Sequence, residues 1–196
     1  MDKIKYYAIK DDNNSTIVTS WDLAKEIIKQ YNKPVYKSFS IKEEAECFIK
    51  GIEYDDGIKE PKCYIDGSFN ESNNTYGFGC ILIIDNKEYR FKKTYDKIDE
   101  YTALRNVSGE IKAAGFIINY CYKNGIKKLH IFYDYMGIEA WYTKKWKARS
   151  NIAIEYQKFA DEIRNEIEVV FHKVKSHTNN KYNEIVDKLA KEACGL

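Results

Sequence analysis

The sequence predicts an α/β protein in which a small ββαβα domain precedes a mixed five-stranded sheet with flanking helices. Three observations support this fold class. Short runs of alternating apolar residues, typical of strands, are interspersed with segments of helical period. One stretch near residue 57 has no regular spacing of apolar residues, which separates two parts of the chain. The elements predicted after it follow the order βββαβ(αα)βα. A chain of 196 residues is long enough for one ordinary domain and a small module.

The stretch without periodicity, residues 52–62 (IEYDDGIKEPK), concentrates acidic residues and glycine and holds one of the two prolines. Such composition is typical of a linker between domains. We therefore expect a domain over residues 1–51, a linker over 52–62 and a second domain over 63–196.

In the first part, residues 6–9 and 17–21 have the pattern of strands, separated by a polar turn. A helix is expected over 22–31, a third strand over 35–39 and a second helix over 40–50. Ser40 and Glu43 have the spacing of a capping pair at the start of that second helix. About fifty residues bury only a thin core, which suits a binding module better than an enzyme.

In the second part, three consecutive strands are expected over 63–67, 77–84 and 88–95, and they should pair antiparallel. A long helix over 106–124 places apolar side chains on one face, namely those of Ile111, Ala114, Ile117, Ile118 and Cys121. Strands over 128–133 and 168–174 and helices over 136–143, 151–165 and 181–193 follow. This order predicts a mixed sheet with helices packed over it.

Composition excludes several classes of protein. Apolar residues make up 44% and charged residues 32%, which is typical of a globular chain. No apolar run approaches the roughly 18 residues that a membrane span needs, and because the first residues (MDKIK) lead into a charged segment we expect no signal peptide. We expect a cytoplasmic protein with no membrane partner. The five widely spaced cysteines favour buried thiols over a disulfide framework or a zinc site.

Four carboxylates stand where the predicted elements meet. Asp66 interrupts an apolar strand, Asp134 ends another, Glu110 lies early in the long helix and Asp187 lies in the last helix. Each has a simpler interpretation when taken alone: Asp134 as a turn former, Glu110 as a solvated side chain and Asp187 as a partner of Lys191 at i+4. Together they match the arrangement by which two divalent cations, about 4 Å apart, promote phosphodiester displacement.

Five short motifs carry a family resemblance, in this order: YIDGS (64–68), NVSGE (106–110), IFYD (131–134), VKSH (174–177) and NEIVDKLA (183–190). They resemble the landmarks of type 1 ribonuclease H across residues 63–196. The resemblance implies an RNase H-like fold and hydrolysis of the RNA strand in RNA/DNA hybrids, which leaves 3′-hydroxyl and 5′-phosphate ends.

The same resemblance assigns Asp66, Glu110, Asp134 and Asp187 as ligands of two Mg²⁺ ions, with Mn²⁺ as a possible substitute; hard oxygen ligands suit both metals. Asp66 is expected to bridge the two ions. His177, ten residues before Asp187 in a polar loop, is expected to assist proton transfer or product release.

Further positions match substrate contacts of the family. Asn106 corresponds to a residue that contacts the substrate backbone near the cut, and it could also cap its helix. Gly67 and Ser68 could offer backbone contacts to the RNA strand, and Arg105 is a candidate for a phosphate contact.

The basic segment, residues 141–149, interleaves aromatic rings with four positive charges and no acid. It can be read as an amphipathic helix with a solvated basic face. The resemblance favours contact with the DNA strand through Trp141, Trp146 and Lys147, since rings stack on sugars or bases while charges neutralise phosphates.

Residues 4–51 resemble the hybrid-binding domain, also called viroplasmin-like, that precedes such enzymes. Tyr7, Trp21 and Lys37 match the positions that grip the hybrid, whereas Tyr36 is expected to pack. The turn at 11–16 (DDNNST) is acidic where the family is basic, so weaker phosphate attraction is expected there.

Three functions remain open on sequence grounds. The leading hypothesis is a monomeric, metal-dependent endonuclease whose partner is an RNA/DNA hybrid. The alternatives are a non-catalytic hybrid-binding protein on the same fold and a nuclease that cuts DNA junctions or transposon ends. All four carboxylates argue against the first alternative, because binding alone does not need like charges gathered together.

Overall fold

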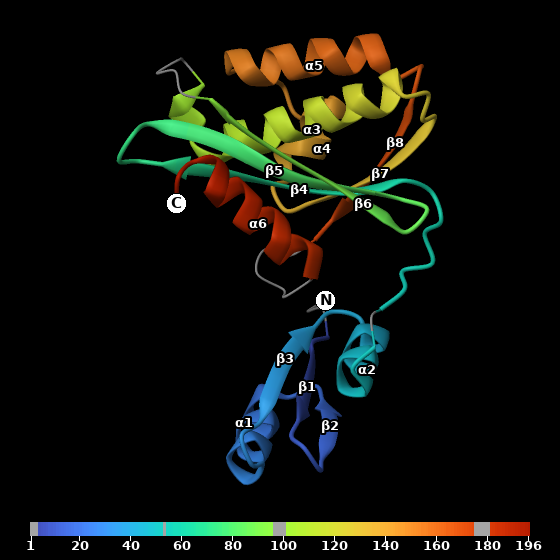
Figure 1. Cartoon of the computed structure of the whole chain (residues 1–196), viewed down its shortest axis with the longest axis vertical. Coiled ribbons are helices and arrows are strands. Elements are labelled where there is room, and N and C mark those ends of the chain that lie inside the picture. Colours follow the sequence, from blue (N-terminus) through green and yellow to red (C-terminus); the bar gives the residue numbers. More distant parts are fainter. Residues whose placement is uncertain (1–3, 53, 96–100, 175–180) are drawn as a thin grey trace. The chain divides into compact units, whose positions relative to one another are not determined.

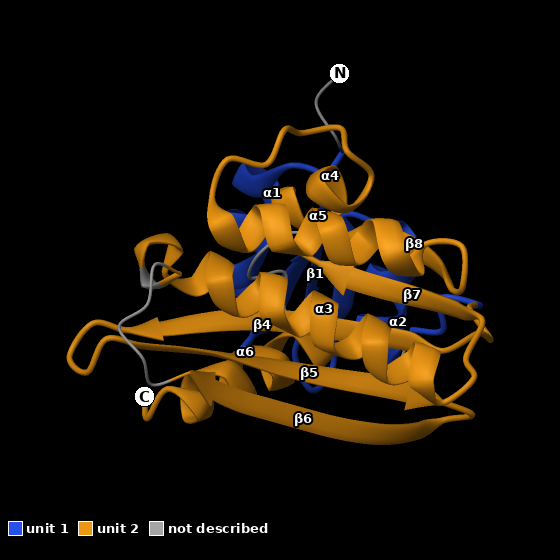
Figure 2. Ribbon diagram, turned by 90° about the horizontal axis from the view of Figure 1, so that it is seen from above, with its two compact units in different colours: residues 1–57 blue, residues 58–196 orange. Residues whose placement is uncertain are grey.

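The computed structural model describes residues 4–52, 54–95, 101–174 and 181–196. The chain forms two compact units, residues 1–57 and 58–196 (Figures 1 and 2). The division falls inside the stretch expected to be a linker. Each unit has its own sheet, as the sequence predicts.

The N-terminal unit is a three-stranded antiparallel sheet in the order β2-β1-β3 with two helices. Its elements are β1 (Tyr6–Lys10), β2 (Ser15–Val18), α1 (Trp21–Gln30), β3 (Val35–Phe39) and α2 (Lys42–Lys50). The core is thin, as expected: the buried apolar side chains of the unit's described residues are those of Ala8, Ile9, Ala24 and Ala45. So small a core leaves most side chains of the unit exposed.

The two helices of this unit begin differently. Ser20 caps α1, because its hydroxyl accepts a hydrogen bond from the Leu23 amide at 3.4 Å. The predicted capping pair of Ser40 and Glu43 is wrong: α2 begins at Lys42, and Ile41 occupies the capping position without a side-chain hydrogen bond. Ser40 therefore lies one residue too early to cap the helix.

The C-terminal unit holds a five-stranded mixed sheet in the order β6-β5-β4-β7-β8. The antiparallel strands β4 (Lys62–Asn70), β5 (Thr75–Ile84) and β6 (Lys87–Tyr95) come first in the chain, and β7 (Lys128–Tyr133) and β8 (Glu168–Lys173) add in parallel beyond β4. Asp85 and Asn86 have φ of 50° and 62°, which is the left-handed pair that a two-residue hairpin turn requires.

Helices cover both faces of this sheet (Figure 1). On one face lie α3 (Asn106–Lys123), α4 (Gly137–Tyr142) and α5 (Asn151–Ile163), and on the other lies α6 (Lys181–Ala193); a short 3₁₀ helix, η1 (Thr102–Leu104), precedes α3. The five apolar residues predicted to face the core from α3 are all buried. A larger core lies under α3 and α5, and a smaller one lies under α6.

The five cysteines are free thiols, and four of them are buried.

Within the described residues, none of the helices has the length and apolarity that crossing a bilayer requires.

Candidate functional site

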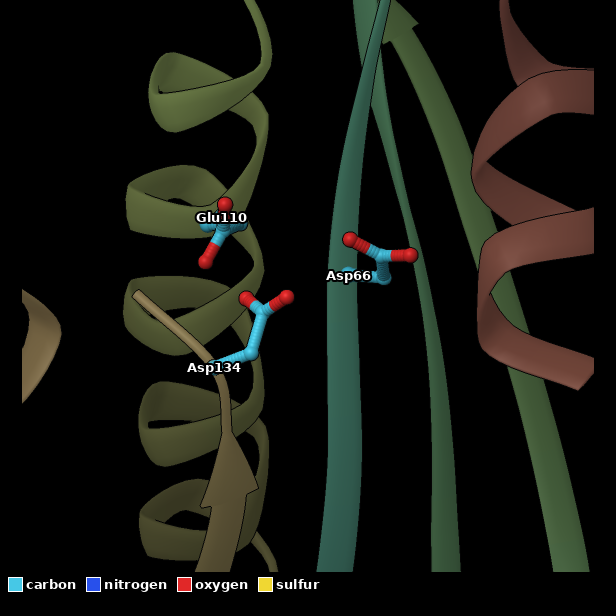
Figure 3. Close-up of side chains that lie close together, drawn as sticks. All are labelled: Asp66, Glu110 and Asp134. Atoms are coloured by element: carbon cyan, nitrogen blue, oxygen red, sulfur yellow. The ribbon is translucent and has the colours of Figure 1, made fainter. Parts of the chain in front are cut away.

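Three carboxylates from three separate elements converge in the C-terminal unit (Figure 3). Asp66 lies in β4, Glu110 in α3, and Asp134 directly follows β7. One oxygen from each lies within 4.8 Å of the others. We call Asp66, Glu110 and Asp134 the carboxylate cluster. The parallel pairing of β4 with β7 brings the end of β7 beside the middle of β4.

Glycine brings Glu110 to this position. A side chain at Gly67 would lie 2.2 Å from the Asn106 carbonyl oxygen, and one at Gly109 would lie 2.1 Å from the Gly77 carbonyl oxygen. Only glycine allows the first turn of α3 to lie so close to β4 and β5. From the sequence we predict only a substrate contact for Gly67 and no role for Gly109, although a glycine directly before a helical carboxylate is a usable signal.

Asp66 is held in an environment that opposes its charge. Burial, followed by the negative charge of Asp134, raises the pKa of Asp66 to about 7, although the Gly67 amide donates to its Oδ1 at 2.8 Å. Protonation of the Asp66 carboxylate, or binding of a nearby cation, would therefore stabilise it.

The surroundings oppose the charged form of Glu110 more strongly than that of Asp66. It is only 2% exposed, and burial together with the charges of Asp134 and Asp66 raises its pKa to about 9. Its Oε2 is buried and has no hydrogen-bond partner among the described residues. A buried carboxylate oxygen without a donor is costly unless a cation or a proton neutralises it. The cluster therefore fits a hard divalent cation such as Mg²⁺ or Mn²⁺, which oxygen ligands prefer.

The other two predicted catalytic residues are placed differently. Asp187 in α6 lies outside the close group, and its carboxylate is paired with Lys191 at 2.8 Å. This is the i+4 pair that its sequence also allowed. Asp187 nevertheless contributes to raising the pKa of Asp66. His177 lies outside the described residues.

The predicted substrate contacts at the start of α3 flank the cluster. Asn106 is the first residue of α3 and is exposed, and Arg105 occupies the capping position with a φ of 51°. The Arg105 guanidinium pairs with Glu71 at 2.7 Å. Ser68 is buried, and its carbonyl oxygen accepts a hydrogen bond from the Cys194 thiol at 3.3 Å. Arg105 and Asn106 thus present more surface to a ligand than Ser68 does.

The basic segment has buried and exposed members. Trp141 is 9% exposed and packs in the larger core, whereas Trp146 is 44% exposed and meets Trp141 edge to face at 6.1 Å. Lys144 and Lys145 are paired with Asp161 and Glu139. Lys147 is exposed and has no ion pair among the described residues. Trp146 and Lys147 are therefore the more accessible of the three predicted contacts.

In the N-terminal unit, Tyr7 and Trp21 lie together, with ring centroids 5.2 Å apart. Tyr36, which we expected to pack, joins them: its ring lies 6.3 Å from Trp21 and the residue is 51% exposed. We call Tyr7, Trp21 and Tyr36 the aromatic surface. Three neighbouring rings, two of them about half exposed, can stack on sugars or bases.

Lys37 lies apart from this surface. Tyr7 pairs with Ser38 and Ala8 pairs with Lys37, so alternation along the strands directs Tyr7 and Lys37 to opposite faces. The Lys37 ammonium lies 5.5 Å from the Phe39 ring and 5.9 Å from the Phe48 ring of α2.

Two family models match the chain. The model described as "Ribonuclease H1 N-terminal domain" matches residues 5–49, and the model described as "RNase H" matches residues 59–195. The second match covers more than half of the chain.

Individual proteins agree with these matches. A ribonuclease H of Clostridium botulinum is 26% identical over 146 residues, which are 69% of this chain and 96% of that protein. The crystal structure of RNase H1 from Halobacterium salinarum is similar with a TM-score of 0.57 at 19% identity, over 69% of this chain and 98% of that one. LC11-RNase H1, solved in complex with an RNA/DNA hybrid, has a TM-score of 0.54 at 14% identity, over 68% of this chain and 99% of that one.

Proposed function

The chain belongs to the ribonuclease H family, and from this membership we propose that it is an endonuclease that hydrolyses the RNA strand of RNA/DNA hybrids with two divalent metal ions. The products would carry 3′-hydroxyl and 5′-phosphate ends. Support for the substrate comes from the family and from the relative that was solved with a hybrid bound.

The observation that carries this proposal is the carboxylate cluster. Three acidic groups within 4.8 Å repel one another unless a cation lies among them, and one of them is 2% exposed with an oxygen that has no partner in the described part of the chain. A protein that only bound hybrids would have no use for this arrangement, because nucleic-acid phosphates are themselves negative.

Each acidic residue has a part in the proposed reaction. Asp66, Glu110 and Asp134 would hold the metal, and Asp187 would join them by exchanging its Lys191 partner for a cation. When bound, divalent cations activate a water molecule for attack and stabilise the leaving oxygen. The low exposure of Glu110 keeps its carboxylate from being hydrated, which strengthens its attraction for a cation. We assign His177 to proton transfer or product release.

Other residues would hold the substrate. Asn106, Arg105 and the backbone at Gly67 and Ser68 flank the cluster, on the side of the RNA strand in this proposal. Trp146 and Lys147, with the buried Trp141 behind them, would contact the DNA strand. The aromatic surface would hold the same hybrid and raise its effective concentration at the cluster.

The test is cleavage of an end-labelled RNA/DNA hybrid in Mg²⁺ or Mn²⁺, with duplex RNA and duplex DNA of the same sequence as comparisons. We expect the hybrid alone to be cut, at its RNA strand, and Asp134→Asn to remove the cutting while circular dichroism shows an intact fold. Treating the products with a polymerase that extends only 3′-hydroxyl ends would check the end chemistry.

Two outcomes would contradict the proposal. Binding of the hybrid without cleavage in either metal would favour a non-catalytic hybrid-binding protein. Cutting of branched or duplex DNA in preference to the hybrid would favour the other nucleases that share this fold.

A further inference from the structure

The carboxylate of Glu139 in α4 joins two parts of the C-terminal unit. Its Oε2 accepts a hydrogen bond from the Tyr133 hydroxyl at 2.6 Å, and its Oε1 accepts one from the Lys145 ammonium at 2.6 Å. Both partners lower the pKa of Glu139, Lys145 the more strongly, so the group is ionised at neutral pH. One side chain thus bridges the end of β7 and the basic segment.

The Tyr133 end of this bridge is fixed in the sheet. Tyr133 is fully buried, is the last residue of β7 and directly precedes Asp134 of the carboxylate cluster. Its ring meets Phe171 of β8 edge to face at 5.8 Å, and its carbonyl oxygen accepts from the Val174 amide at 2.8 Å. The hydroxyl therefore provides a rigid reference point, one residue away from a proposed metal ligand.

The Lys145 end of the bridge lies in the part of the basic segment that turns back over α4. The Trp146 amide donates to the Ala140 carbonyl oxygen at 3.0 Å, and Gln157 of α5 donates to the Trp146 carbonyl oxygen at 2.8 Å. Trp146 is thus held immediately beside the Glu139–Lys145 ion pair. Because Lys145 directly precedes Trp146, the ion pair and the exposed ring belong to consecutive residues of the segment.

The charges of the basic segment are divided between two tasks. Lys144 is engaged by Asp161 at 2.8 Å and Lys145 by Glu139, whereas Lys147 and Arg149 are exposed and have no ion pair within the part of the chain that the structure describes. Two of the four cations thus anchor the segment, and two remain for phosphates.

We propose that Glu139 is a positioning residue, which sets the basic segment at a fixed place relative to the carboxylate cluster and so determines how the hybrid is held for cleavage. This inference rests on the proposed function. Glu139 itself need not touch the substrate. Because β7 is held by its own strand pairings, loss of the bridge should loosen the segment and leave Asp134 in place.

The test is steady-state cleavage of a defined hybrid by full-length variants. Glu139→Gln keeps an acceptor for Tyr133 but loses the charge that holds Lys145, and we expect it to raise KM by roughly threefold to tenfold with little change in kcat. The cut positions along the hybrid should also spread. A purely structural role would instead lower the active fraction and leave KM and the cut positions unmoved.

Lys144→Gln is the matched control for Lys145→Gln. Both remove one charge and one ion pair from the same segment, but only Lys145 is connected to Tyr133; Asp161 remains paired with Arg164 at 2.8 Å. We expect the larger rise in KM from Lys145→Gln. If the bridge acts as a unit, adding Tyr133→Phe to Lys145→Gln should change KM little further, whereas independent effects would multiply.

Thermal unfolding of each variant shows that it is folded, and Tyr133→Phe and Lys145→Gln interrupt the bridge from its two ends should Glu139→Gln be unstable. Equal effects of the two lysine variants, or a fall in kcat with KM unchanged, would overturn the inference alone. A wild-type chain that cuts no hybrid would overturn the proposed function, and the inference with it.

Discussion

In the carboxylate cluster Glu110 is 2% exposed and lies against two further acids, whereas in the aromatic surface Trp21 is 44% and Tyr36 51% exposed among uncharged rings. The first site depends on burial, which makes its charges costly in the absence of a cation. The second depends on exposure, and it belongs to a unit whose described core is made largely of small residues. Both regions lie within one chain of 196 residues.

The comparison of the buried cluster with the exposed surface shows in which region the proposed function lowers the stability of the fold. A buried group of like charges destabilises the metal-free fold, so such an arrangement indicates a selected function. Exposed rings destabilise a fold little, and they indicate a binding surface only when several of them gather. Substitutions in the two regions should therefore have different effects. In the carboxylate cluster they should lower activity and raise the stability of the metal-free protein, whereas at the aromatic surface they should lower only the affinity for the hybrid.

The largest expected effect is on activity in the cluster. Glu110→Gln removes a proposed metal ligand, and because partners that only support metal ligands already contribute about 10- to 100-fold, we expect cleavage to fall on the order of a thousandfold. Asp187→Asn should lose less, since Asp187 is paired with Lys191 outside the close group. Single-turnover cleavage rates over a range of Mg²⁺ concentrations measure both; equal losses would show that the metal site extends to Asp187 as strongly as to Glu110.

The same substitution should stabilise the metal-free protein. At pH 8 the Glu110 carboxyl, with a pKa of about 9, must take up a proton when the metal-free chain folds, whereas an amide at this position needs none. We therefore expect the free energy of unfolding of Glu110→Gln at pH 8 in a chelator to rise by about 2 kcal/mol, with the melting temperature about 5 °C higher. The pH dependence follows from the sign of the pKa shifts. The pKa values of Asp66 and Glu110, about 7 and about 9, are raised above those of the unfolded chain, so their contribution is present in acid and is lost as pH rises from about 4 through 9.

Urea unfolding in a chelator at pH 5, 7 and 9 checks this prediction. Wild type should lose stability across that range, and Glu110→Gln should lose less of it. Asp187→Asn is the matched control, because its carboxylate is paired with a lysine and contributes only a little to the raised pKa of Asp66, so its gain in stability should be much smaller. A pH slope in Glu110→Gln as steep as that of wild type would show that the cluster's charges do not oppose folding.

Part of this contrast can be predicted from the sequence. The part that cannot be predicted depends on contacts between elements that are distant in the chain. Asp66 and Asp134 could be located because an acid that interrupts or ends an apolar strand is visible in a local pattern. Burial of Trp141 and the pairing of Lys144 with Asp161 and of Lys145 with Glu139 could not, because they depend on how α4, α5 and the segment between them pack. Local patterns predict elements, whereas pairings of side chains across elements depend on tertiary packing.

At the aromatic surface the expected effect is on affinity. Trp21→Ala removes the central ring of the three, and we expect hybrid binding to weaken by roughly tenfold, since one stacked base contributes about 1–3 kcal/mol. The kcat at saturating hybrid and the melting temperature should change little. Fluorescence anisotropy with a labelled hybrid measures the affinity, and Leu23→Ala is the control, because Leu23 is on the same helix and 52% exposed. Equal losses in the two variants would show that α1 as a whole, not the ring, supports binding.

The smallest effect is expected at Lys37. Its ammonium lies beside Phe39 and Phe48 on the face opposite Tyr7, so Lys37→Gln should weaken hybrid binding only about twofold and change the salt dependence of binding by less than one phosphate contact. Lys29→Gln in α1 is the control for loss of one charge, since Lys29 is exposed and paired with Glu26. The affinity for the hybrid, measured from low to moderate salt for both variants, distinguishes a direct phosphate contact by Lys37 from the general loss of one positive charge. A loss at Lys37 as large as that at Trp21 would mean that the hybrid reaches both faces of the small sheet, and the aromatic surface would then be only half of the binding site.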